Sequence, residues 1–378
     1  MLVTQLHALV NTVTQEILGE SVVVNEDLSN VVDIGNTVFG SDQVDNYVKK
    51  LVDHIGKTVF VDRAYAGGVP SVLMDGWEFG SVLEKISTDL PDAQENKSWD
   101  LTDGEEYSQD VFKAPNVEAK FFNSKVTFEI QMSFTEKQLK SAFSSAAQLN
   151  GFISMLHNSV ENSLTVKLDG LIQRAFNNMI GETATDANPI RYVNLLTEYN
   201  TATGNTLKAD ACLSDANFVM WATWKIGVIS DRLTKISTLF NVGGKARFTP
   251  SDLQNTVLLS DFSKSSETFV LSSTYDGEKA TLPKHDTVPY WQGSGTDYSF
   301  SDITKVDVKT ASGNTVVVTG VLGVIADRDA IAVANMDKRT TVAYNARAEF
   351  YNNWFKADAQ YINDLNENFV VFYVKDSE

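Results

Sequence analysis

Residues 148–180 read QLNGFISMLHNSVENSLTVKLDGLIQRAFNNMI, and this stretch has the periodicity of one long amphipathic helix. At about 1.5 Å per residue such a helix is on the order of 50 Å long, and Gly181 after it suits a left-handed C-terminal cap. The sequence therefore predicts a spine helix with one buried face. Taken alone, it also fits the longest core helix of an α+β enzyme. The apolar positions are Leu149, Phe152, Ile153, Leu156, Val160, Leu164, Leu168, Leu171, Ile172, Ala175, Phe176 and Met179.

The composition is that of a globular chain. Of its 378 residues, 43% are hydrophobic and 21% are charged, which is enough to bury one large or two moderate cores. No apolar run is as long as a membrane span, and the N-terminal residues lack a basic leader and a cleavage site, so we expect a soluble protein without Sec export. The single cysteine, Cys212, excludes an intrachain disulfide and is expected to be a buried apolar side chain.

The net charge of -18 opposes tight binding to nucleic acid. Phosphate binding needs clustered Lys and Arg, and the basic pairs Lys49-Lys50 and Lys338-Arg339 do not extend into a patch. Any contact with DNA is therefore expected to be loose.

The N-terminal third predicts two helices. Residues 3–18 have apolar side chains at helical spacing, which fits either a core helix or an arm. Residues 42–55 predict a second helix, with Ser41 as its N-cap and Gly56 as its end. After Gly56 the apolar period changes to two, in TVFVDRAY, which predicts an extended segment.

A protruding β-hairpin is predicted next. Extended segments lie on both sides of an acidic polar insert, PDAQENKSWDLTDGEEYSQD at 91–110. An isolated ribbon is marginal in water, so its aromatic side chains need a partner. From the pattern alone, that partner is either another subunit or the chain's own domain. The aromatic residues are Trp77, Phe79, Trp99 and Tyr107.

The rest of the chain alternates between helical and extended patterns. Thr135 and Gln138 form a capping box for a short helix to about residue 143. Further helices are predicted at 191–200 and 215–240, with a domain boundary in the polar stretch between them. From residue 256 onward short strands are predicted, including TVLLSDF, TFVLSST, TVPYW, KVDVKT and the closing NFVVFYV.

No catalytic, cofactor or metal site is predicted. The four histidines are isolated from one another, and His157 is interpreted as a packed residue of the spine helix. The Gly-rich pieces GGVP, VGGK and GSGTD match no phosphate-binding motif. Asp327 and Asp329 are interpreted as turn residues, and the acidic series Asp297, Asp302 and Asp307 lacks the ligand order of an EF-hand.

Three runs of sequence carry a family resemblance. They are DNYVKKLVDHIGKTVF at 45–60, FGSVLEKISTDL at 79–90 and the segment from VFKAPNVEAKFF to MLHNSVENSL at 111–164. With these runs the chain resembles the major capsid proteins of tailed bacteriophages, especially those of phi-29-like short-tailed phages. The resemblance covers about 46–182 well and 320–378 more weakly.

The resemblance implies an α+β fold of the Hong Kong 97 type, with an N-terminal arm, an extended β-hairpin loop, a spine helix in a peripheral domain, and an axial domain. The function it implies is self-assembly into the icosahedral head shell that encloses the phage DNA genome. The exposed aromatics Trp77, Phe79, Trp99 and Tyr107 then become intersubunit contacts. The implied divisions are 1–56 for the arm and helix, 57–134 for the extended loop and its base, 135–202 for the peripheral domain with the spine at 148–180, 203–330 for the axial domain, and 331–378 for the return to the peripheral domain.

The implied partners are further copies in hexamers and pentamers, a separate scaffolding protein, a portal protein and loosely held DNA, with no membrane. The implied location is the virion, after assembly in the host cytoplasm. No enzyme activity and no cofactor are expected. Two alternatives stay open: the shell of an encapsulin-type nanocompartment, which shares the fold, and an enzyme with an unrecognised site.

Overall fold

The computed structural model describes most of the chain, which folds into two compact units. Unit 1 comprises residues 1–80, 125–174 and 333–361, and unit 2 comprises 81–124, 175–332 and 362–378. The described residues are 3–19, 22–40, 43–61, 73–74, 83–88, 95–107, 112, 114, 116–122, 125–273, 282–292, 299–310, 313 and 315–376.

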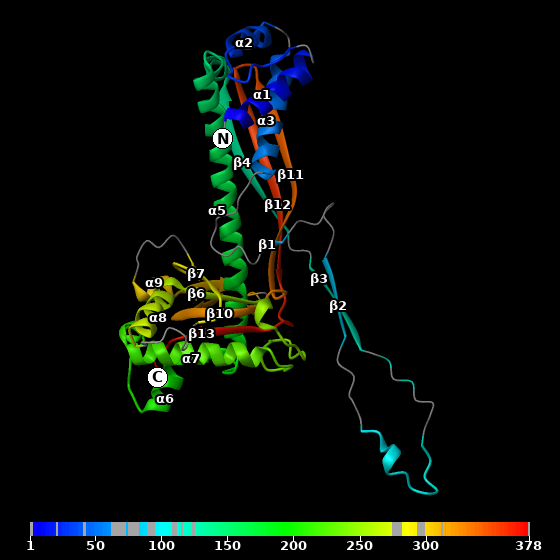
Figure 1. Ribbon diagram of the computed structural model, residues 1–378, viewed down its shortest axis with the longest axis vertical. Helices are drawn as coiled ribbons and strands as arrows, with labels where there is room; N and C mark the ends of the chain where they lie inside the picture. The colour runs from blue at the N-terminus through cyan, green and yellow to red at the C-terminus, as the bar shows by residue number, and fades with distance from the viewer. Residues whose placement is uncertain are drawn as a thin grey trace. The chain divides into compact units, whose positions relative to one another are not determined.

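Unit 1 combines helices with a four-stranded sheet (Figure 1). The helices are α1 (Val3–Leu18), α2 (Val31–Phe39), α3 (Val44–Val61), α4 (Glu136–Ala142) and the first part of α5 (Ala146–Asp186). The strand order is β1-β11-β12-β4, with β1 at Leu73–Met74, β11 at Ile331–Asn345, β12 at Phe350–Asn363 and β4 at Lys125–Thr135. Strands β12 and β4 are antiparallel over eleven residue pairs, from Phe350↔Thr135 to Gln360↔Lys125.

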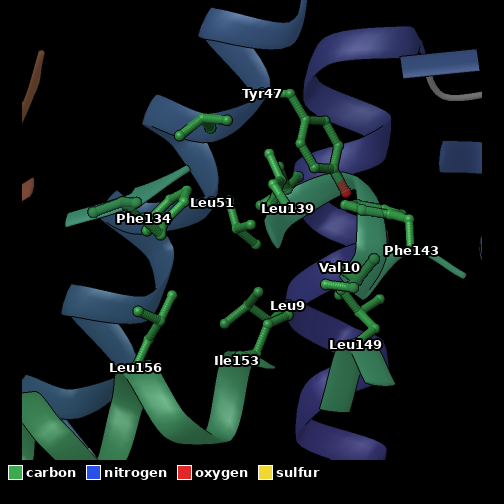
Figure 2. Packing of buried hydrophobic residues seen from close by; sticks show 14 of the residues in the cluster. Leu9, Val10, Tyr47, Leu51, Phe134, Leu139, Phe143, Leu149, Ile153 and Leu156 are labelled. Atoms are coloured by element: carbon green, nitrogen blue, oxygen red, sulfur yellow. The ribbon is translucent and has the colours of Figure 1, made fainter. Parts of the chain in front are cut away.

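The core of unit 1 lies where α1, α3, α4 and α5 meet (Figure 2). Tyr47 packs edge-on against Phe143, with ring centroids 5.8 Å apart. The capping box is present as predicted, because Thr135 Oγ1 accepts from the Gln138 amide while the Thr135 amide donates to Gln138 Oε1. Helix α1 contributes buried side chains to this core. They are Leu9, Val10 and Val13.

The prediction of the spine helix is confirmed for its buried face and is wrong about its C-terminal end. Every apolar position predicted to be buried from Leu149 to Met179 is buried, except Phe152, which is partly buried. The helix does not stop at Gly181 but continues to Asp186, and Ala187 follows it with a φ of 53°. Gly181 is needed for close packing, since a Cβ there would lie 2.4 Å from Val308 Cγ2.

Two other N-terminal predictions need correction. Helix α3 runs through Gly56 to Val61, so the first residues of the predicted extended segment are helical; the remainder of that segment, and Ser41, lie outside the described residues. Residues 31–39 form helix α2, which the sequence pattern did not predict. Its Val31, Ile34 and Val38 are buried, because its short apolar stripe packs into the core of unit 1.

Unit 2 contains a five-stranded sheet with the order β5-β13-β10-β6-β7 (Figure 1). Strand β10 is buried along its whole length and lies antiparallel to both β13 and β6. Helix α8 packs on β6, β7 and α7. The strand bounds are Tyr192–Asn194 for β5, Gln254–Leu259 for β6, His285–Val288 for β7, Val321–Asp327 for β10 and Phe369–Tyr373 for β13.

The remaining elements of unit 2 include one further correction. The stretch TFVLSST, predicted as a strand, belongs to helix α8 (Ser260–Ser273) as far as Ser273. The predicted helices at 191–200 and 215–240 appear as α6 (Leu195–Thr203) and α7 (Ala216–Leu233), so the first begins later and the second ends earlier than predicted. Asp215 caps α7. The short elements are η3 (Lys97–Trp99), η4 (Cys212–Ser214), η5 (Ser251–Leu253), α9 (Phe300–Ile303), β8 (Val306–Lys309) and β9 (Thr315–Val318).

Candidate assembly surface

Unit 2 also includes an antiparallel ribbon of two strands, β2 (Leu83–Thr88) and β3 (Val117–Phe122), which we call the ribbon. Its register pairs Lys85 with Lys120 and Ile86 with Ala119. Because directly opposed residues point to the same side, the two lysines share one face and Ile86 lies on the other. Among the described side chains, one face of the ribbon is thus mainly charged, with Phe122 beside the charges, and the other is mainly apolar.

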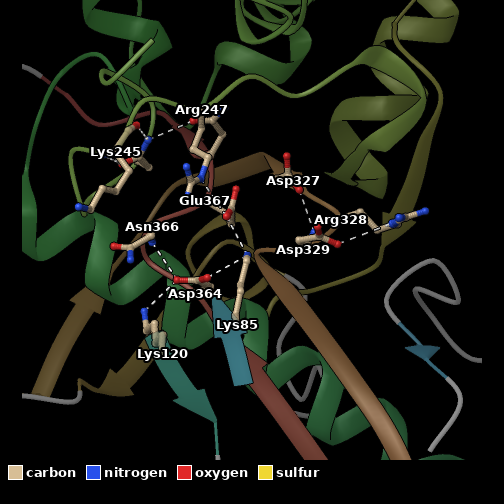
Figure 3. A network of polar contacts seen from close by, with 12 residues as sticks. Lys85, Lys120, Lys245, Arg247, Asp327, Arg328, Asp329, Asp364, Asn366 and Glu367 are labelled. Carbon is tan, nitrogen blue, oxygen red and sulfur yellow. Dashed lines mark hydrogen bonds and ion pairs between the residues drawn. The ribbon is translucent and has the colours of Figure 1, made fainter. Parts of the chain in front are cut away.

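The charged face of the ribbon is bound to the turn between β12 and β13 (Figure 3). The Nζ atoms of Lys85 and Lys120 lie 3.0 Å and 2.8 Å from the two carboxylate oxygens of Asp364. Lys85 Nζ is also 2.7 Å from Glu367 Oε1. The Asp364 side chain is only 2% exposed, so these contacts are shielded from water. Phe122 is buried on the same face, below the Lys120 ammonium.

The segment around residues 237–247 makes two more ion pairs. Arg247 Nε donates to Glu367 Oε1 at 3.0 Å, and Lys245 Nζ donates to Glu118 Oε1 of β3 at 2.7 Å. The amide of Gly243 donates to the Leu365 carbonyl at 2.8 Å. A Cβ at position 243 would clash with the side chain of Asn366, so this close approach requires glycine. We call Lys85, Lys120, Glu118, Lys245, Arg247, Asp364 and Glu367 the ion-pair network.

The electrostatics of the network favour fully charged partners at neutral pH. Burial raises the pKa of Asp364, but hydrogen bonding and charge from Lys120 and Lys85 outweigh it, and the net pKa is lowered. For Lys85, burial lowers the pKa, while Glu367 and Asp364 together raise it above its ordinary value. Groups held this firmly in their charged forms are suited to fixing geometry and are poor general acids or bases at neutral pH.

The opposite face of the ribbon and the segment beyond it expose apolar side chains. Of the residues proposed as intersubunit contacts, Trp99 is 96% exposed and Tyr107 is 49% exposed. Tyr107 Oη accepts a hydrogen bond from the Thr102 amide at 3.1 Å. Trp77 and Phe79 lie outside the described residues. Other strongly exposed apolar residues here are Ile86, Leu101, Phe112, Val117 and Phe121.

The candidate catalytic and metal-binding residues Cys212, Asp327 and Asp329 do not form an active site or a metal site. Cys212 is fully buried, and burial raises the pKa of its thiol to about 12. Asp327 accepts hydrogen bonds from Thr249 Oγ1 at 2.5 Å and from the Asp329 amide at 2.8 Å, as expected of a turn residue. Among the described residues, no group of three or more His, Cys, Asp or Glu is arranged to hold a metal ion. Within the same residues, no helix is both long enough and apolar enough to span a bilayer.

The ion-pair network is not predictable from local sequence patterns. Its partners are far apart in the sequence, with 279 positions separating Lys85 from Asp364, so no local pattern joins them. A partial signal was nevertheless present, since VEAKF at 117–121 alternates apolar and charged residues. The acidic turn NDLNEN at 363–368 lies between two strands and has no basic neighbour in the sequence.

Comparisons with known proteins agree with one another. The family model for the Phi29-like phage major capsid protein matches residues 8–373. A curated major capsid protein of Bacillus phage GA-1 is 28% identical over 145 residues, which are 37% of this chain and only 29% of that relative's length.

Two solved structures share the fold. A chain in the capsid structure of Staphylococcus phage Andhra aligns with 83% of this chain and 86% of its own, with a TM-score of 0.52 and 8% identity. A chain in the structure of the head fiber and inner core protein gp22 of native bacteriophage P68 aligns with 82% and 86%, with a TM-score of 0.51 and 9% identity. The prediction of an α+β fold of the Hong Kong 97 type is thereby confirmed.

Proposed function

Because this chain belongs to the family of Phi29-like phage major capsid proteins, we propose that it is the subunit of an icosahedral head shell enclosing a phage DNA genome. The observation that carries the proposal is the extent of the family match, from residue 8 to residue 373. It includes both compact units and the ribbon with its exposed side chains. The same match favours a phage head over an encapsulin-type compartment and over an enzyme.

The exposed side chains beyond the ribbon supply a physical reason for assembly. Trp99 and Phe112 are 96% and 90% exposed, which is unusual for large aromatic side chains. Burying one such ring, of about 150–250 Å², against another copy contributes a few kcal/mol at about 25 cal/mol per Å². A contact of this size is weak alone, but a closed shell repeats it in every subunit. We therefore propose that Trp77, Phe79, Trp99 and Tyr107 contact a neighbouring copy in hexamers and pentamers.

The roles of the chain's segments follow from this proposal. Residues 57–134 act as the extended loop and its base, and 135–202 act as the peripheral domain that contains the spine helix. Residues 1–56 serve as the N-terminal arm and helix, 203–330 as the axial domain, and 331–378 as the return to the peripheral domain. Burial of Leu9, Val10 and Val13 supports a first helix that packs on its own subunit.

The proposed partners are further copies of the chain, a separate scaffolding protein and a portal protein, with assembly in the host cytoplasm and a final location in the virion. The net charge of -18 supports only loose contact between the wall and the packaged DNA. No membrane partner is proposed. The protein acts as a structural subunit without an enzymatic step or a cofactor.

Sedimentation velocity tests this proposal. The purified protein is run alone and after coexpression with the neighbouring genes of its source. We expect the coexpressed sample to contain a discrete, fast boundary of shell size, and removal of the scaffold gene to replace it with capsomers or irregular aggregates. A stable monomer under every condition would contradict the shell function, and copurification of a cargo enzyme would favour the nanocompartment alternative.

A further inference from the structure

We infer that the ion-pair network is a positioning device that determines which face of the ribbon is presented to a neighbouring copy. The inference rests on the proposed shell function and adds specific residues to it. Lys85, Lys120 and Glu118 on the ribbon are the positioned groups. Asp364 and Glu367 hold the two lysines, and Lys245 holds Glu118.

The ribbon is inverted relative to the usual arrangement. A β-ribbon that packs on its own domain normally turns its apolar face inward and its polar face to water. Here the charged residues Lys85 and Lys120 face the turn at Asp364, while Ile86 and Phe121 are 64% and 61% exposed. Phe122 is buried on the charged face, but the network leaves Ile86 and Phe121 outward, against the hydrophobic effect. Such a placement is useful only if another surface covers that face.

The geometry of Asp364 makes the choice of face specific. Each of its carboxylate oxygens accepts from a lysine of a different strand, Oδ2 from Lys85 of β2 and Oδ1 from Lys120 of β3. A slip of either strand by one residue would turn its lysine to the opposite face and break one of the two pairs. The single carboxylate therefore fixes both the register and the orientation of the ribbon.

The carboxylate itself is held by the backbone of unit 2. The Asp364 amide donates to the Ala330 carbonyl at 2.8 Å, and Asp364 Oδ1 also accepts from the Asn366 amide at 3.0 Å. Asp364 is buried, while Lys85 and Lys120 are 28% and 39% exposed, so salt screens these pairs less than it screens pairs with both partners at the surface. The ribbon is consequently attached to a rigid turn.

A second, separate pair supports the same role. Lys245 and Glu118 join the ribbon to the 237–247 segment through one contact between two side chains. Glu118 points to the charged face, since it precedes Ala119 and lies two residues from Lys120. The side chains of Lys245 and Glu118 are 20% and 48% exposed, so neither is fully buried and the two charges can be exchanged in place.

The test measures the position of the ribbon in the full chain. Spin labels are placed at the exposed sites Thr88→Cys on β2 and Asp252→Cys near β6, and the native Cys212 is too deeply buried to be labelled. Pulsed electron paramagnetic resonance gives the distribution of distances between the labels. We expect one narrow distribution in the parent and a broad one in Lys85→Met/Lys120→Met. The matched control, Lys284→Met, removes an exposed lysine of unit 2 and should leave the distribution narrow.

Shell formation by the same variants is then compared by sedimentation. We expect Lys85→Met/Lys120→Met to lower the yield of shells at least tenfold and Lys284→Met to change it less than twofold. Circular dichroism must show the parent helix content in each variant. A narrow distance distribution in Lys85→Met/Lys120→Met would overturn the inference, as would a broad distribution with an unchanged shell yield.

Exchanging the charges of Glu118 and Lys245 separates a lost ion pair from general destabilisation, because only a lost ion pair is restored when both charges are reversed. Glu118→Lys and Lys245→Glu should each broaden the distribution and lower the yield, and the double exchange should restore both. Failure of the double variant to recover, with its fold intact, would overturn the positioning role. Absence of shells from the unmodified chain would instead overturn the proposed function, and the distance data would show whether the network still holds the ribbon.

Discussion

Leu164 and Val166 are two residues apart on α5 and have opposite environments. Leu164 is 1% exposed and packs in the core of unit 1, whereas Val166 is 68% exposed. Leu164→Asp would bury a carboxylate without a partner, which costs several kcal/mol against a total stability of about 5–15 kcal/mol. We expect this variant to be largely unfolded or insoluble in thermal melting and solubility assays.

Val166→Asp is the matched control, because it places the same carboxylate on the exposed side of the same helix. Its melting temperature should stay within a few degrees of the parent's. Equal melting of the two variants would show that residue 164 does not face the core.

Asp364 and Lys85 set the pH range over which the ribbon is held. The pKa of Asp364 is lowered, so its contribution is present above about pH 4, the unfolded value, and is lost as the pH falls through the lower folded pKa. The pKa of Lys85 is raised, so its contribution is present below about pH 10.5 and is lost above the raised value.

We therefore expect the distance between labels at positions 88 and 252 to be constant from about pH 5 to about pH 9. Broadening should begin only below about pH 4, in samples whose helix content is intact by circular dichroism. A transition between pH 6 and pH 8 would mean that a group other than Asp364 and Lys85 controls the ribbon.

At the scale of single residues, the sequence predicted whether a side chain is buried or exposed, but it did not predict contacts between distant residues. The burial of Cys212 was predicted from its residue type, whereas the exposure of Trp99 was predicted only by the family resemblance, since the local pattern left two possibilities open. The Lys85–Asp364 pair joins residues 279 positions apart, and its formation depends on the folding of β12 and β13. Local sequence patterns contain no information on which residues pair when they are this far apart in the sequence.

Among the elements, α5 shows that apolar periodicity predicts the buried face of a helix but not the residue at which the helix ends. The apolar repeat located the buried face of the helix, but glycine at position 181 was interpreted as a cap when it is a packing position. Replacing Gly181 by Ala gains about 1 kcal/mol of helix propensity and costs about 1–3 kcal/mol of overpacking against Val308.

We expect Gly181→Ala to lower the stability to urea in the parent and to raise it in a Val308→Ala background. The sign change arises because the smaller residue at position 308 removes the contact that a Cβ would make at 2.4 Å. A stabilising effect of similar size in both backgrounds would show that Val308 does not crowd position 181. A destabilising effect of similar size in both would restore the interpretation of Gly181 as a left-handed cap.

For part of helix α8 the predicted type of secondary structure was wrong. The stretch TFVLSST is rich in β-branched residues and was predicted as a strand, yet as far as Ser273 it lies in a helix that packs on β6, β7 and α7. Tertiary packing decides such short segments, because propensity differences are only a few tenths of a kcal/mol per residue. The helices at 3–18, 136–142 and 216–233 were predictable since caps or a sustained repeat marked them.

The segment beyond the ribbon is predicted to serve assembly and not the stability of the subunit. Residues 95–107 are exposed wherever their burial is described. Replacing them by a short Gly-Ser linker should leave the melting temperature and circular dichroism unchanged and abolish shell formation. Closed shells of the deletion variant in electron micrographs would show that the extended-loop assignment is wrong.

The whole molecule is a large acidic chain without a recognisable reactive centre in its described part. Membership of the capsid family, the shared fold and the inverted ribbon point to a subunit that is completed only by its neighbours. The net charge of -18 is the basis of the proposal that the wall contacts the packaged DNA only loosely. Sequence resemblance predicted this function because several separate runs agree with one family.

Electron microscopy of the purified protein, expressed alone and with the neighbouring genes of its source, tests the proposed shell function most directly. We expect uniform closed shells, or rings of capsomers, in at least the coexpressed sample. Single, well-separated monomers in every sample would contradict the claim that this chain builds a shell.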